Sequence, residues 1–152
     1  MDEASRNVVA FLEGVQAARQ ELHAVWNHYT RRGLKVSSHA FRFGPIWAPD
    51  GYLDLGMMVT GADGRNYELS ARLRWSGGEW VVQADARLEP ESEAGDLSYP
   101  VLRNLPEQRA AHWPTALGHL RAAVAGLAGF DDLIPAQPRH AEPGAAPDRG
   151  GI

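Results

Sequence analysis

One stretch decides the fold: residues 67–75 read YELSARLRW, residues 76–79 read SGGE, and residues 80–88 read WVVQADARL. Apolar and polar side chains alternate throughout the first segment, which predicts a strand with one buried face. Gly77 and Gly78 can adopt the positive φ angles of a two-residue hairpin turn. The third segment is therefore predicted to return antiparallel to the first.

The two-residue turn fixes the register of this hairpin. On one face of the hairpin, apolar residues then lie opposite apolar residues. On the other face, Glu68 lies opposite Arg87, so the same register suits both faces. The predicted apolar pairs are Trp75–Trp80, Leu73–Val82 and Ala71–Ala84.

Two more strands are predicted upstream. Alternation over residues 53–59 predicts one of them, and a five-residue loop from Gly61 to Arg65 sets Val59 opposite Tyr67. A four-residue loop would turn the apolar residues of this strand outward, so we prefer five. An earlier strand is predicted over about residues 34–43, after which a segment with Pro and Gly turns the chain back.

Helical patterns flank this meander. Apolar residues at three- and four-residue steps predict an amphipathic helix from Asp2 to about Arg32, in which Gly14 indicates a bend or a close backbone contact. Pro106 and Pro114 suit the first turns of two later helices. Those helices are predicted over about residues 107–112 and 115–128. The result is an α+β fold: a long N-terminal helix, a four-stranded antiparallel meander and a C-terminal helix pair, with the helices packed on one sheet face.

The length of 152 residues fits one domain. Hydrophobic residues make up 44% and charged residues 22%, which is typical of globular proteins. Residues 135–152 contain 4 Pro, 3 Gly and 4 Ala, or 11 of 18, and few apolar side chains that could dock. We predict a single α+β domain over residues 1–134 and a disordered tail over residues 135–152.

Composition narrows the classes of function. The absence of Cys excludes disulfides and thiol catalysis, and 15 basic against 19 acidic residues disfavour a uniformly basic, nucleic-acid-binding surface. The start Met1-Asp2-Glu3 lacks the basic region of a secretory signal, and no apolar run approaches the length of a membrane span. We expect a cytoplasmic bacterial protein with no nucleic-acid or membrane partner and no cofactor.

Common catalytic motifs are missing from the sequence. No two of its six His have the i, i+4 spacing that brings two imidazoles to one metal on a helix. Ser70 and Asp85 lie opposite each other in the predicted register, but no His falls beside them, so we reject a catalytic triad. We assign no catalytic residue and no metal site; the sequence favours a non-enzymatic role and leaves catalysis open.

The sheet face away from the helices is the surface expected to bind a partner. Its basic residues are Arg, whose guanidinium makes bidentate contacts with carboxylates and phosphates. Trp47, between Pro45 and Pro49 in a loop, suits an anchor for a partner. The predicted binding residues are Arg42, Arg72, Arg74, Arg87 and Trp47. An equally simple interpretation is a solvated face whose charges pair with each other, and the face lacks the stacking aromatic residues of a single-strand nucleic-acid platform.

We therefore expect a small non-catalytic protein-binding module, of a chaperone-like or immunity (antitoxin) type, that uses this Arg-bearing face. The alternative is a small-molecule-binding or catalytic domain with an aromatic-lined cavity between sheet and helices. Its polar group is His39, expected on the helix-covered face, or His112. The residues of this alternative pocket are His39, His112, Trp26 and Trp113. The identity of the partner and the oligomeric state stay open.

Overall fold

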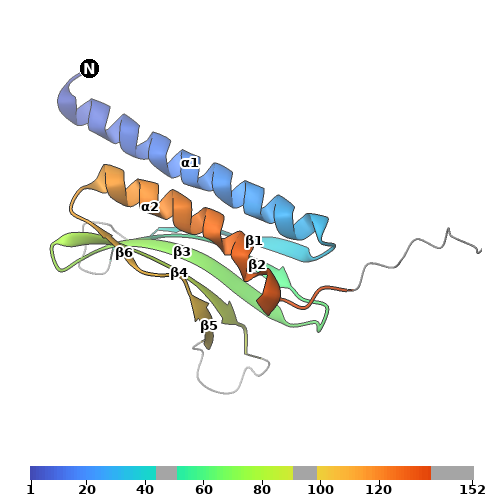
Figure 1. The fold of residues 1–152 in the computed structure, drawn as a ribbon. Helices are drawn as coiled ribbons and strands as arrows, with labels where there is room; N and C mark the ends of the chain where they lie inside the picture. The colour runs from blue at the N-terminus through green and yellow to red at the C-terminus, as the bar shows by residue number, and fades with distance from the viewer. Residues whose placement is uncertain (44–50, 91–98, 138–152) are drawn as a thin grey trace, which may run out of the picture.

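The computed structural model describes residues 1–43, 51–90 and 99–137, with the side chains of 38–43 left aside. Its elements are, in chain order, α1 (Glu3–Arg31), β1 (Lys35–Phe43), β2 (Tyr52–Thr60), β3 (Asn66–Ser76), β4 (Glu79–Leu88), β5 (Val101–Asn104), β6 (Gln108–Ala110), α2 (Trp113–Gly126) and the 3-10 helix η1 (Leu127–Leu133). Both α-helices lie on the same face of one antiparallel sheet (Figure 1). The fold is therefore α+β with a long N-terminal helix, as the sequence predicts. Within the described ranges, no helix has the length and apolar character to cross a membrane.

The central meander has the predicted register. Trp75 of β3 lies opposite Trp80 of β4, and their rings meet edge to face with centroids 5.1 Å apart. Gly77 and Gly78 have φ angles of 62° and 83°, which the two-residue turn requires. The five-residue loop is also confirmed, because Val59 of β2 lies opposite Tyr67.

The sheet has more strands than the predicted four. β5 and β6 both pair with β4, beside different parts of it. The predicted helix over residues 107–112 is wrong, because Gln108–Ala110 form β6 opposite Trp80–Val82. A three-residue strand is too short to show a period in the sequence, and its hydrogen bonds come from a segment distant along the chain.

An irregularity in β1 corrects the predicted position of His39. His39 lies opposite Gly56, whereas Phe43 lies opposite the core residue Leu53, because the register shifts between His39 and Arg42. An extra residue in one strand of a pair inverts the alternation of faces beyond it. The backbone pairing therefore sets His39 beside Gly56 and not beside a core residue of β2, which differs from the predicted register.

The two helices pack closely at a glycine of α1. A Cβ atom at Gly14 would lie 2.6 Å from Cδ1 of Leu117, so the missing side chain lets α2 approach α1. This confirms the close contact that the sequence indicated. At the start of α1, the Asp2 carboxylate accepts a hydrogen bond from the Ser5 N–H at 2.7 Å and caps the first turn.

One α-helix followed by a 3-10 helix replaces the predicted C-terminal helix pair. α2 begins at Trp113 with Pro114 in its first turn, where a missing N–H breaks no helical hydrogen bond. η1 then buries Leu127 and Phe130. The largest side chains buried between helices and sheet are Tyr29, Phe130, Leu53, Leu55, Met57, Leu69, Leu73, Leu120 and Leu127.

Most of the predicted tail, residues 138–152, lies outside the described residues. The carbonyl of Pro135 accepts a hydrogen bond from the Ala62 N–H at 2.7 Å, and Ala136 packs partly buried against the core. The contacts of the folded body thus extend to residue 136.

Candidate functional site: the open face of the sheet

The sheet face away from the helices, which we call the open face, carries a connected set of polar side chains. The strand register places Asp54 of β2 beside Arg72 of β3, and Ser70 of β3 beside Asp85 of β4. These positions alternate with core residues, which brings them all to one face. Asp54, Ser70, Arg72, Asp85 and Arg87 are referred to below as the sheet-face cluster.

Asp54 is the centre of the sheet-face cluster and is only 5% exposed. The Ser70 hydroxyl donates to one of its carboxylate oxygens, and Nη2 of Arg72 donates to the other at 3.1 Å. A buried carboxylate requires such partners, because its charge has lost the solvation of water. The Arg72 guanidinium also lies over the Tyr52 ring, 5.0 Å from its centroid. Arg72 is thus fixed in position from two sides.

Asp85 holds Arg87 through a bidentate ion pair. Nε and Nη2 of Arg87 donate to the two carboxylate oxygens at 3.0 and 2.9 Å. Hydrogen bonding to Asp85 raises the pKa of Arg87 above its ordinary value, so the group stays charged. The Nε atoms of Arg72 and Arg74 are both buried without a hydrogen-bond partner. Arg74 differs from the other two arginines in that no described carboxylate accepts a hydrogen bond from its side chain.

Four members of the sheet-face cluster border a small polar recess of about 50 Å³, and Glu68 and Gln83 complete its described lining. The four are Ser70, Arg72, Asp85 and Arg87. A water molecule fills about 30 Å³ of liquid, so the recess has room for water or a small ion and not for an organic substrate. Of the charged groups beside it, Arg72 pairs with Asp54 and Arg87 pairs with Asp85.

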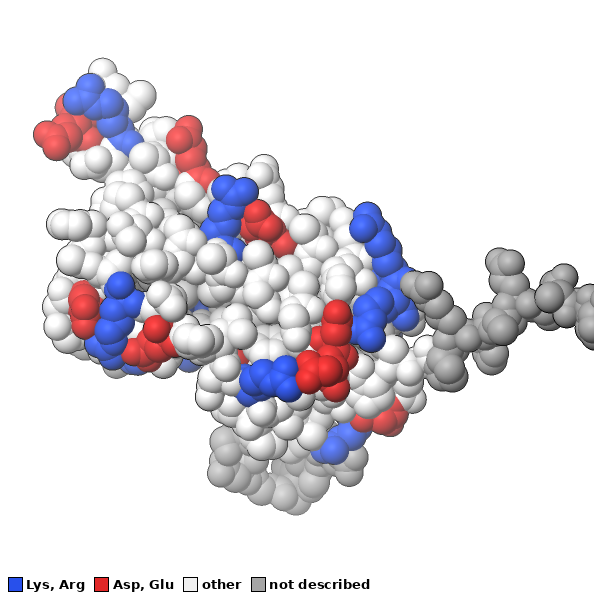
Figure 2. Space-filling model, in the orientation of Figure 1, with Lys and Arg blue, Asp and Glu red and all other residues white. Residues whose placement is uncertain are grey.

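Charged side chains also pair at other places on the described surface. Arg109 bridges Glu79 and Glu107, and Arg103 meets Asp132 at 2.7 Å. Figure 2 shows the same pattern, with basic and acidic side chains mostly side by side on the face in view. Exposed pairs of this kind add little stability. They do leave that face without a broad region of a single sign.

The structure brings together part of the predicted binding set. Arg72, Arg74 and Arg87 occupy neighbouring positions of the open face. Arg42 lies opposite Asp54 in the register, which places its backbone at the β1 end of the same row. Trp47 lies outside the described residues.

The residues of the alternative pocket are not brought together. His39 has a register position on the open face, whereas His112 is exposed directly before α2 on the helix side. Trp113 packs edge to face against Phe11 with ring centroids 5.8 Å apart, and Trp26 is partly buried against the core. The two Trp residues therefore serve the packing of the helices.

Sequence analysis missed a second charged cluster, which joins the end of α1 to η1. Nε2 of His28 lies 2.8 Å from both carboxylate oxygens of Asp131, and Arg32 also donates to Asp131. Beside it, the buried Tyr29 hydroxyl donates to the Leu127 carbonyl at 2.7 Å, and burial raises the pKa of that hydroxyl. No sequence spacing signals this cluster, because Asp131 comes about a hundred residues after His28. Among the residues that the structure describes, no group of three or more His, Asp or Glu could hold a metal ion.

No protein-family model, curated protein or solved structure matches this chain.

Proposed function

We propose that the protein is a small non-catalytic protein-binding module of a chaperone-like or immunity type, and that the open face is its contact surface. The sheet-face cluster is the observation that carries this proposal. The helices leave this face uncovered, yet Arg72 and Arg87 are held in fixed positions on it by Asp54 and Asp85. Side chains that are already ordered lose less conformational entropy when a partner binds.

The chemistry of the open face suits a partner that presents carboxylates. A guanidinium has five N–H donors, and Asp54 takes one from Arg72 while Asp85 takes two from Arg87. Donors therefore remain on both residues for an acidic segment. Arg74 adds a further positive charge, and its guanidinium donates no hydrogen bond to a described carboxylate.

Arg74 is the best residue for the test. Replacing Arg72 with Glu would place a second acid against the buried Asp54, so a loss of binding could not be separated from a loss of fold. Arg74→Glu reverses the charge at one position of the open face and leaves the Asp54 and Asp85 contacts in place. Arg121→Glu is the matched control, because Arg121 lies on α2, where it meets Glu21 at 3.0 Å, and makes the same change of charge.

The experiment is affinity capture from an extract of the native host, quantified by mass spectrometry. A partner bound by the wild type and by Arg121→Glu should fall about tenfold or more with Arg74→Glu, and added salt should weaken its capture. Equal capture by all three proteins would overturn the open-face proposal.

A further inference from the structure

The N-terminal half of α1 presents an apolar surface that the rest of the described chain does not cover. In Figure 1 this end of α1 lies farther from the sheet than the C-terminal end of the helix does. Residues 3–10 are helical and all exposed, and Val8 and Leu12 are each 59% exposed. Val, Asn and Ser are weak helix formers, and a short helix without tertiary contacts is marginal in water. Packing against a second surface would stabilise this segment.

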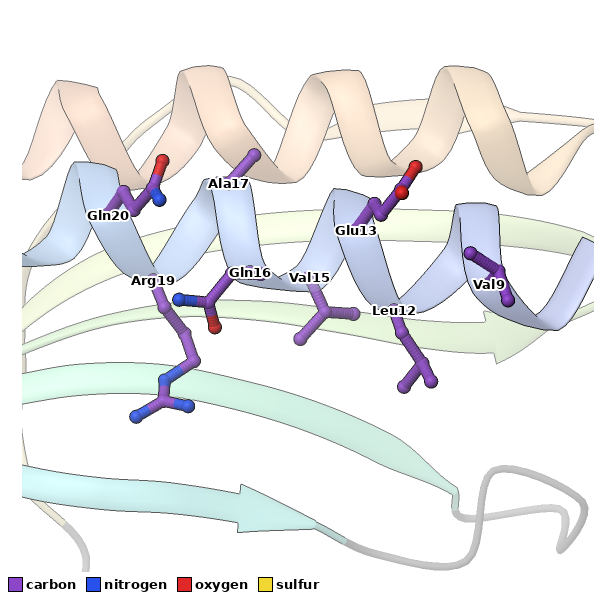
Figure 3. A pocket seen from close by; sticks show the side chains of 8 residues that line it. All are labelled: Val9, Leu12, Glu13, Val15, Gln16, Ala17, Arg19 and Gln20. Atoms are coloured by element: carbon purple, nitrogen blue, oxygen red, sulfur yellow. The ribbon is translucent and has the colours of Figure 1, made fainter.

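A shallow groove of about 580 Å³ runs along the same part of α1 (Figure 3). The described residues that line it extend from Val9 to Gln20, all on α1. In Figure 3, Leu12 and Arg19 point to one side of the helix and Glu13 and Ala17 to the other. At 1.5 Å per residue the groove is roughly 17 Å long, which suits an elongated occupant such as a helix.

The charges along α1 indicate which helix could occupy this groove. Glu3 is followed by Arg6, then by Glu13 and Arg19, so the sign alternates along the helix. Arg6 and Glu13 are exposed, and neither forms an ion pair with another described residue. They are seven residues apart, so they lie on the same side of the helix and too far apart to pair with each other.

The charges of one α1 helix are complementary to those of a second α1 helix that runs in the opposite direction. If two copies of α1 lie antiparallel and are related by a twofold axis near residue 10, Arg6 of each copy meets Glu13 of the other. The same alignment sets Val8 of each copy against Leu12 of the other. A parallel pairing would instead set Arg6 against Arg6 and Glu13 against Glu13, which repel.

We infer that the occupant of this surface is a second copy of the chain, and that the protein forms an antiparallel dimer through the N-terminal halves of α1. The shared contact covers about residues 1–19, or roughly 27 Å of helix. A single helix pair buries less surface than an obligate dimer, so the association is weak and reversible. The open face lies on the other side of the sheet and stays accessible in this dimer.

Charge reversal tests the pairing. Sedimentation equilibrium of the full chain from about 1 µM to 1 mM should show a monomer–dimer equilibrium. Arg6→Glu and Glu13→Arg should each raise the dimer dissociation constant by about tenfold, because each change turns two attractive pairs into repulsive ones. The double variant should return to within about threefold of the wild type. Arg31→Glu is the control, because it makes the same change on the exposed surface of α1 beyond the contact and should leave the equilibrium unchanged.

The direction of pairing has its own test, which is possible because the chain contains no Cys. A mixture of Ser5→Cys and Gln16→Cys should form the mixed disulfide, since these residues face each other across the proposed axis. Each variant alone should cross-link poorly. A monomer at all concentrations would overturn the inference, and so would a dimer that is unaffected by the charge reversals.

Discussion

Asp54 supports the open face through its charge. Asp54→Asn keeps the shape of the side chain but leaves Arg72 without its anion and weakens the bond from Ser70. We expect this change to lower the free energy of unfolding by about 2 kcal/mol, below the usual loss for a fully buried pair because Arg72 is partly exposed. Asp132→Asn is the control, since Asp132 pairs with Arg103 at an exposed site, where loss of the pair should change the free energy of unfolding much less. Urea unfolding measures both changes, and equal losses would contradict this role of Asp54.

Gly56 allows two strands to lie close together. A Cβ atom there would lie 2.6 Å from the backbone carbonyl oxygen of Leu69, which cannot rotate away as a side chain can. Gly56→Ala should therefore destabilise the protein by about 1–3 kcal/mol. Gly118→Ala gives the opposite expectation, because α2 has open space there and Ala is the better helix former by about 1 kcal/mol. Thermal unfolding of the two variants should shift in opposite directions; a stabilising Gly56→Ala would show that the strands can separate freely at this point.

At the scale of residues, the sequence predicts the face on which a side chain lies but not its depth. Alternation alone places Asp54, Arg72 and Arg87 on the open face, and the register confirms it. The burial of Asp54 depends on Ser70 and Arg72 reaching over it from the next strand. No local pattern shows this, because long side chains cover or expose a neighbour according to the hydrogen bonds they make.

Among the elements, the loop between β2 and β3 makes stability depend on alkaline pH. The Tyr67 hydroxyl donates to the Asp63 carboxylate at 2.7 Å. Burial first, and then the bond to Asp63, raise the pKa of Tyr67 to about 12. An unfolded Tyr ionises near pH 10, so this contribution is complete below about pH 10 and is lost as the pH rises through about 12.

Tyr67→Phe removes this pH dependence. The variant should be less stable than the wild type at pH 9, and the difference should shrink as the pH approaches about 12. Denaturant unfolding at a series of pH values gives the comparison, and absorbance of the tyrosinate gives the pKa directly. A stability difference that does not change over this range would show that ionisation of Tyr67 is not linked to folding.

Elements were predictable where a pattern was long enough to repeat. The hairpin of β3 and β4 and the helix α1 show many periods, and the sequence identified all three. β6 has only three residues. The wrong helix prediction there was based on Pro106, because a proline suits the start of a helix as well as an extended segment. The register of His39 also could not be predicted from local sequence. The shift inside β1 arises from pairing with β2 and not from the composition of β1.

Two truncated chains test at which residue the folded body ends. A chain that ends at Gln137 keeps the hydrogen bond from Ala62 to Pro135 and the contact of Ala136, whereas a chain that ends at Ile134 loses both. We expect the shorter chain to be less stable by about 1 kcal/mol. Equal melting curves for the two truncated chains would show that residues 135–137 add nothing to the folded body.

A protein partner bound to the open face would cover Met58, and the rate of methionine oxidation measures this protection. Met58 is partly exposed and lies opposite Glu68 on the open face, Met1 is exposed at the start of α1, and Met57 is buried in the core. Brief oxidation of the free protein and of the captured complex, both at one low concentration, is followed by mass spectrometry of each Met. We expect Met58 to be oxidised more slowly in the complex than in the free protein. Met1 should be oxidised at the same rate in both, and the buried Met57 should stay largely unoxidised in both. Protection of Met1 with no change at Met58 would show that the partner binds α1 and not the open face.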